Sequence, residues 1–259
     1  MSKTENQLRE EIVRVGRLVF EKGWVAANDG NITVRLSDGH LLSTPTGVCK
    51  GMMKPEDLIV CDLDGGKIHG ERERTTEMAM HLTVYRMRPD IHSVVHAHPP
   101  VATGFACAGR ALNIGLLPEV VISLGSVPLA DYGLPGTPAL TAGMLPYIAK
   151  YDALLMANHG AVSYGEDLWQ AYFRMEMVEH YARILLVAEL LGGARALPRV
   201  EVEKLFESRT RYRVKSRNHF EPGAPMTAED LPEPGEKIEM TREQLVAIID
   251  EALKVRGLV

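Results

Sequence analysis

Two histidines separated by one residue are the first residues of this chain that could do chemistry. His96 and His98 end the apolar run Val94-Val95-His96-Ala97-His98, which has the composition of a β-strand. Side chains alternate between the two faces of a strand, so both imidazoles point the same way. Two nitrogens on one face are half of a metal site. An isolated His-x-His motif also occurs as two surface or hydrogen-bonded histidines without a metal. Other residues of the chain are therefore needed to distinguish the two interpretations.

Two further residues could complete such a site. His159 lies between an apolar, strand-like run and Gly160, and Glu77 lies in the first turn of a predicted helix that opens with Thr75-Thr76. The helix dipole favours a carboxylate at that position. Three neutral imidazoles and one carboxylate suit Zn²⁺ or a similar divalent ion. Spacing alone does not show that these four residues meet in space.

The elements that would position these residues alternate between helices and short strands. An amphipathic helix opens the chain and ends near Gly23, and a later apolar stripe predicts a long helix over 166–191. Between them we expect a hairpin (32–36 with 40–43), short strands at 58–62 and 67–68, a helix (75–88), a strand (93–97), one or two strands within 120–129, a helix (137–150) and strands at 153–156 and 161–164. Several strand pairs are joined by tight turns, which predicts an α/β fold with an antiparallel or mixed sheet.

Composition limits the possible classes of protein. The chain has 259 residues, 46% of them apolar and 24% charged, with a net charge of -5, so we expect a globular protein and no nucleic-acid partner. Its three widely spaced cysteines indicate no disulfide framework, and no apolar stretch is long enough for a membrane span. We therefore expect a cytoplasmic protein without a membrane partner. Pro, Gly and acidic residues from 219 onward predict an arm followed by a terminal helix, which divides the chain into 1–218 and 219–259.

Several motifs, taken together and in order, resemble one known family. They are Thr75-Thr76-Glu77, His81, Tyr85, Arg88-Pro89-Asp90, Val94-Val95-His96-Ala97-His98 and Asn158-His159-Gly160. This set resembles the class II aldolase/adducin family and, among its enzymes, is most similar to the L-fuculose-1-phosphate aldolases, from the first helix to about Gly193. The resemblance implies a three-layer α/β/α sandwich with a mainly antiparallel central sheet, and a homotetramer with active sites between subunits. It also implies that His96, His98, His159 and Glu77 bind Zn²⁺, or another divalent ion such as Mn²⁺ or Co²⁺, and that Glu77 is the catalytic acid/base.

The same resemblance gives a role to three loops that otherwise look like ordinary turns. Gly30-Asn31, Thr46-Gly47 and Thr75-Thr76 match the family's phosphate-binding positions. They offer an amide, hydroxyls and backbone N–H groups, with Thr75-Thr76 at a helix N-terminus that favours an anion. The expected substrate is a small phosphorylated sugar, whose phosphate these groups can hold without lysine or arginine.

The implied reaction is retro-aldol cleavage of a ketose 1-phosphate to dihydroxyacetone phosphate and an aldehyde. The tyrosine that such aldolases use on the aldehyde side falls here near Leu117, so Glu119 becomes a candidate proton donor, with Tyr132 and Tyr212 as weaker ones. Because of this departure, an epimerase, a sugar-acid-phosphate decarboxylase and a dehydratase stay open as alternatives that would use the same metal-enediolate. A non-catalytic adducin-like binding protein is the alternative outside enzymes.

Overall fold

The computed structural model of the protein describes residues 3–212, 214 and 227–230. The helices are α1 (Glu5–Glu21), the 3-10 helix η1 (Pro55–Asp57), α2 (Met78–Met87), α3 (Pro100–Cys107), α4 (Pro118–Ser123), α5 (Pro138–Ile148), α6 (Leu168–Leu190) and α7 (Arg199–Ser208). The strands are β1 (Asn31–Arg35), β2 (Leu41–Ser43), β3 (Ile59–Cys61), β4 (Lys67–His69), β5 (Ser93–Ala97), β6 (Leu129–Ala130), β7 (Ala153–Met156) and β8 (Gly160–Gly165). Within these described residues, no helix combines the length and apolar character needed to cross a membrane.

One eight-stranded sheet runs through the molecule in the order β4-β3-β2-β1-β5-β8-β7-β6. Every neighbouring pair is antiparallel except β6 with β7, which is parallel. The expectation of a mainly antiparallel sheet is therefore corrected to a mixed sheet with one parallel pair at its edge. The physical reason is the connection between these two strands, since the chain passes through α5 and so returns in the same direction.

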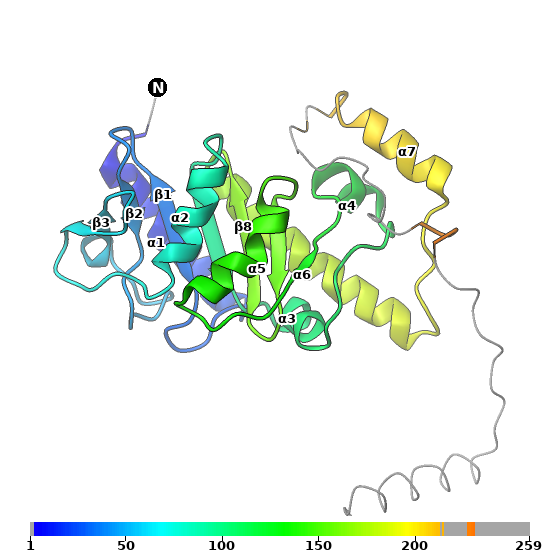
Figure 1. Ribbon diagram of the computed structural model, residues 1–259, viewed down its shortest axis with the longest axis horizontal. Coiled ribbons are helices and arrows are strands. Elements are labelled where there is room, and N and C mark those ends of the chain that lie inside the picture. Colours follow the sequence, from blue (N-terminus) through cyan, green and yellow to red (C-terminus); the bar gives the residue numbers. More distant parts are fainter. Residues whose placement is uncertain (1–2, 213, 215–226, 231–259) are drawn as a thin grey trace, which may run out of the picture.

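Helices cover both faces of this sheet (Figure 1). Residues of α1, α3, α4 and α6 share one apolar cluster with one face, and residues of α2 and α5 share a second cluster with the other face. The strands supply both clusters by alternation: Val95 and Ala97 of β5 belong to the first, and Val94 belongs to the second. This arrangement gives three layers, with the sheet in the middle.

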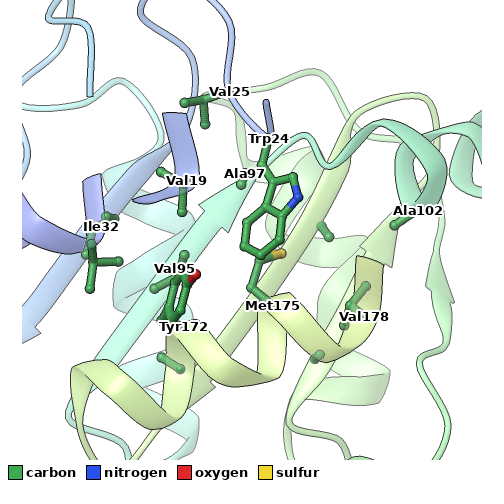
Figure 2. Packing of buried hydrophobic residues seen from close by; sticks show 14 of the residues in the cluster. Val19, Trp24, Val25, Ile32, Val95, Ala97, Ala102, Tyr172, Met175 and Val178 are labelled. Carbon is green, nitrogen blue, oxygen red and sulfur yellow. The ribbon is translucent and has the colours of Figure 1, made fainter. Parts of the chain in front are cut away.

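The first cluster is closed at the end of β5 by aromatic packing. Figure 2 shows Trp24, from the segment after α1, lying against Tyr172 and Met175 of α6 beside Val95 and Ala97. The ring centroids of Trp24 and Tyr172 are 5.9 Å apart, and the backbone N–H of His98 donates to the carbonyl of Trp24 over 2.8 Å. This packing fixes the end of β5, where the two histidines lie.

Most expected elements within the described residues are present, with two differences. The segment 120–129 was expected to hold one or two strands. It begins inside α4 instead, and of its residues only Leu129 belongs to a strand, β6. Pro118 occupies the first turn of α4, where its fixed φ favours a helix. Glu77 is the residue before the first helical residue of α2 rather than part of the first turn. The arm and terminal helix predicted within 219–259 lie almost entirely outside the described residues.

Candidate metal and phosphate site

The sheet register brings β1 and β5 together at the site. Asn31 pairs with His96 across the two antiparallel strands, so both side chains lie on the same face. That face is the one covered by α2 and α5, because Val94, two residues before His96, packs into their cluster. His98 follows with the same parity just beyond the strand, as the alternation predicted.

His159 reaches the same place from the end of β7, two strands away from β5 in the sheet. The ring centroid of His96 is 4.9 Å from that of His98 and 4.7 Å from that of His159. One nitrogen of each ring lies within 4.8 Å of the others, the arrangement of a possible metal site. The structure therefore brings together the three histidines that the sequence could only suggest.

Two residues that flank His159 make this convergence possible. Asn158 adopts a left-handed conformation with φ 55°, which asparagine tolerates better than most residues. A Cβ atom at Gly160 would lie 2.5 Å from Cδ2 of His98 and 2.7 Å from the carbonyl oxygen of Ala97. Only glycine leaves room for β8 to pass this close to the histidines.

The tautomer of His96 is set by its backbone partner. Its Nδ1–H donates to the carbonyl oxygen of Ala161 over 2.9 Å, so in the neutral ring the lone pair is on Nε2. This Nε2 lies 3.1 Å from Nε2 of His98 and 3.3 Å from Oε2 of Glu77. The lone pair thus points into the space among the histidines, as a metal ligand requires.

Glu77 completes the set, which we call the histidine cluster (Glu77, His96, His98 and His159). Oε1 of Glu77 lies 3.1 Å from Nε2 of His159, yet this buried oxygen has no hydrogen bond in proper geometry among the described residues. Burial by itself raises the pKa of Glu77, but the contacts with His159, His96 and Asn31 outweigh it and hold that pKa far below its usual range. An ionised, under-satisfied carboxylate beside three imidazoles fits a divalent cation.

A buried chain of hydrogen bonds supports Glu77 from behind. Nδ2 of Asn31 donates to Oε2 of Glu77 over 2.8 Å, so the amide oxygen of Asn31 faces Nε2 of His81, which must carry the proton. Nδ1 of His81 then accepts from the hydroxyl of Thr33 at 2.8 Å. Burial lowers the pKa of His81 to about 3, which keeps this histidine neutral. Each donor in this series of hydrogen bonds points toward Glu77.

This series of hydrogen bonds shows which partners Asn31 and His81 have inside the protein. The sequence pattern assigned Asn31 to phosphate, whereas the structure places its amide between Glu77 and His81. His81 shares the α2 face with Glu77 and is fully buried. Both residues therefore orient the carboxylate.

Asp29 is a site residue that the sequence treated only as part of a turn. Its Oδ2 lies 3.4 Å from Nδ1 of His98, on the side of the ring opposite Nε2. A carboxylate at this position orients the imidazole and raises its basicity toward a metal. Its proximity to Gly30 and Asn31 in the sequence is the signal that could have identified it.

The three expected phosphate loops lie side by side. Backbone bonds join Thr44 to Ile32 and Thr46 to Glu73, each over 3.0 Å, and Pro45 bridges to Arg74. The hydroxyl of Thr75 accepts from the backbone N–H of Glu77 over 3.2 Å. Thr46, Gly47 and Thr76 are exposed. The N–H of Thr46 is already bonded to Glu73, which leaves the hydroxyls of Thr46 and Thr76 and the backbone of Gly47 open to an anion next to the histidine cluster.

The candidate proton donors on the aldehyde side are exposed residues. Glu119 is exposed in the first turn of α4, and its side chain has no hydrogen bond or ion pair with the histidine cluster within the described part of the chain. Tyr132 and Tyr212 are each 60% exposed. The described residues show no hydrogen bond or ion pair between any of the three and the histidine cluster.

The sequence of this chain also matches the model of a known protein family. Residues 10–186 match the model described as Class II Aldolase and Adducin N-terminal domain, and the chain belongs to this family. The expectation drawn from the motifs is thereby confirmed.

Individual relatives cover most of the chain. It is 34% identical over 190 residues to the 3-oxo-tetronate 4-phosphate decarboxylase of Escherichia coli (strain K12), covering 72% of this chain and 89% of the relative. It is 33% identical over 199 residues to the 5-deoxy-D-ribulose 1-phosphate aldolase of Bacillus thuringiensis serovar kurstaki, covering 76% and 92%. Among solved structures, the L-fuculose-1-phosphate aldolase from Thermus thermophilus superposes with a TM-score of 0.64 at 30% identity, covering 73% of this chain and 98% of that one.

Proposed function

We propose that this protein is a metal-dependent lyase that breaks a carbon–carbon bond in a small phosphorylated sugar, with retro-aldol cleavage of a ketose 1-phosphate as its reaction. The observation that carries this proposal is the histidine cluster: three imidazoles converge, and an ionised Glu77 contacts two of them, His96 and His159. The cluster lies beside the exposed loops at Thr46-Gly47 and Thr76. The aldolase names among the relatives support it.

Glu77, His96, His98 and His159 would hold the divalent ion, which we propose to be Zn²⁺, Mn²⁺ or Co²⁺. When bound, such an ion stabilises negative charge on an oxygen of the substrate. Glu77 would move a proton at the carbon that becomes electron-rich when the bond breaks. The loops at Gly30, Thr46-Gly47 and Thr75-Thr76 would hold the phosphate and so fix which bond lies at Glu77.

Decarboxylation of a 3-oxo sugar-acid phosphate is the second candidate. Retro-aldol cleavage needs a group that removes the proton of the aldehyde-side hydroxyl. Glu119 and Tyr132 are both exposed, and neither has a hydrogen bond or ion pair with the histidine cluster among the described residues. Loss of carbon dioxide needs no such group, only delivery of one proton to carbon. The ionised Glu77 would take this proton up from water and pass it to the carbon. The relatives named 3-oxo-tetronate 4-phosphate decarboxylase favour this candidate. A homotetramer in which a neighbouring subunit completes the site is the corresponding proposal for the aldolase.

One assay separates the two reactions. Metal-loaded protein is incubated with ketose 1-phosphates and with 3-oxo sugar-acid phosphates, and triose phosphate and carbon dioxide are measured separately. We expect triose phosphate from a ketose 1-phosphate. Carbon dioxide without triose phosphate would overturn the retro-aldol proposal in favour of decarboxylation.

Metal analysis tests the site independently of the substrate. We expect about one divalent ion per chain in the wild type and its loss in His96→Ala. His92→Ala is the matched control, because His92 is exposed and lies just before the same strand. Equal metal content in all three proteins would remove the histidine cluster as the metal site.

A further inference from the structure

Lys50 is a buried cation that the proposed reaction leaves unused. Its residue exposure is only 2%. The ammonium Nζ donates to the carbonyl oxygen of Asn28 over 3.0 Å and to that of Val48 over 2.9 Å. A lysine is almost never fully buried unless its charge is paired, so its surroundings need an explanation.

No carboxylate of the described residues forms an ion pair with this charge, although Asp29 acts on it over a longer distance. Among the described residues, no Asp or Glu oxygen lies within the 4.0 Å of an ion pair from Nζ of Lys50. Burial lowers the pKa of Lys50 to about 8, against the opposing influence of Cys49 and Asp29. The group therefore keeps its charge at neutral pH although an unpaired buried charge destabilises a fold. An anion from outside the chain would compensate it.

The position of Lys50 identifies where that anion would lie. Asn28 precedes Gly30 by two residues, and Val48 directly follows Gly47. The two carbonyls that bind the ammonium therefore belong to two of the three loops expected to hold phosphate. The side chain of Lys50 thus links the turn before β1 to the loop after β2. It places a positive charge close to both.

We propose that Lys50 is the cation of the phosphate site: it holds the turn at Asn28–Asn31 and the loop at Thr46–Val48 in place and neutralises the bound phosphate. This inference rests on the phosphorylated substrate of the proposed function. It replaces the expectation that neutral groups alone hold the phosphate. In return, the phosphate supplies the negative charge that the protein itself does not place next to Lys50.

The test measures binding of inorganic phosphate to the metal-loaded, full-length protein at pH 7 by calorimetry. Lys50→Met removes the charge and the donors while keeping the length of the side chain. Lys50→Gln keeps a donor for the carbonyls but no charge, and so remains informative where the methionine variant does not fold. Lys54→Met is the matched control, because Lys54 is exposed and only four residues away.

We expect both Lys50 variants to bind phosphate at least about tenfold more weakly, which corresponds to about 1.4 kcal/mol. Lys54→Met should bind as the wild type does. With a substrate that turns over, the loss should fall on KM rather than kcat, since Lys50 faces the phosphate loops and not the histidine cluster. A lysine with a purely structural role would not raise KM while leaving kcat unchanged.

The outcomes are distinguishable. If Lys50→Gln binds phosphate as tightly as the wild type, the charge is not needed and the inference is overturned while the phosphate site stands. If the wild type itself binds no phosphate, the phosphate site and Lys50's role in it both fail. Phosphate binding that depends on Lys50 in a protein that cleaves none of the sugar phosphates would support this inference and contradict the proposed reaction.

Discussion

The strands β5 and β7 carry a cluster of buried ionisable groups at each of their ends, and the two clusters are built differently. At the beginning of the strands, Arg88 and Arg174 contact Asp152 at 3.0 and 2.8 Å, and Arg88 also contacts Asp90 at 2.8 Å. At the far end lies the histidine cluster. Both ends are buried, yet only the first balances its charges within the chain.

The difference lies in the chemistry of the groups. A guanidinium is permanently charged and presents a rigid fork of donors that matches carboxylates, and Arg88 also donates to the carbonyls of Ile148 and Tyr151. The far end instead has three imidazoles and a carboxylate oxygen of Glu77 that lacks a hydrogen bond among the described residues. Lys50 is buried nearby and has no ion pair with a carboxylate of those residues. Oδ2 of Asp152 also lacks a hydrogen bond in proper geometry among the described residues, but it lies 2.8 Å from Arg174. The paired end therefore balances its charges with its own arginines, whereas the other end is suited to a cation and an anion.

The largest expected effect is on catalysis. Glu77→Gln should lower kcat by about 10²–10⁴-fold, because it removes the group that moves the proton, while most of the metal stays bound to the three histidines. Turnover of the active sugar phosphate and metal content are measured on the same sample. Glu73→Gln, an exposed carboxylate four residues earlier, is the control. Unchanged turnover in Glu77→Gln would remove it from the proposed mechanism.

The next effect is on stability and concerns the paired end. Asp152→Ala should lower the free energy of unfolding by about 3–5 kcal/mol, since it leaves Arg88 and Arg174 buried without their shared carboxylate. Denaturant titration measures this, and metal affinity of the folded variant should not change. Asp90→Ala is the milder comparison, because the side chain of Asp90 is 31% exposed. Equal losses in both variants would contradict the distinction between these carboxylates.

A smaller effect is expected where a carboxylate orients a ligand. Asp29→Asn should weaken metal binding about tenfold, the lower end for partners of metal-binding histidines, because Asp29 is partly exposed and 3.4 Å from His98. A competition assay with a chelator measures it. Asp38→Asn alters another Asp–His pair, formed with His40 on the surface, and should leave metal affinity as it is. Loss of affinity in both variants would show an effect of net charge alone.

A further effect, of similar size to the preceding one, concerns how the stability contributed by Lys50 depends on pH. Between pH 8, the lowered pKa of Lys50, and pH 10.5, its ordinary value, the unfolded chain binds more protons at this residue than the folded chain. The stability of the wild type relative to Lys50→Met should therefore rise across that window, by about 1–3 kcal/mol. Denaturant titrations without phosphate at several pH values measure it. Parallel pH curves for the two proteins would indicate an ordinary lysine pKa in the folded state.

Some parts of the site followed from the sequence because they depend on local rules. The alternation along Val94–His98 placed His96 and His98 on one face, and the hairpin turn at Ser37–Gly39 joined β1 to β2 as expected. The ordered motifs identified the family. The segment after Pro118 shows the limit of local rules: its run of Val, Val and Ile favours a strand, but the chain forms α4, with Val120 and Leu124 packed into the first apolar cluster.

By itself, the sequence determined which residues could bind a metal and a phosphate, and which family's fold would present them. Only the tertiary structure decided which side chains meet. It brought His159 to His96 across the sheet, turned Asn31 toward Glu77, placed Asp29 beside His98, and buried Lys50 between two loops. These contacts join residues far apart in the chain, and strand register, burial and charge compensation set them. No local sequence pattern fixes strand register, burial or charge compensation, because each depends on neighbours that only the folded chain brings together.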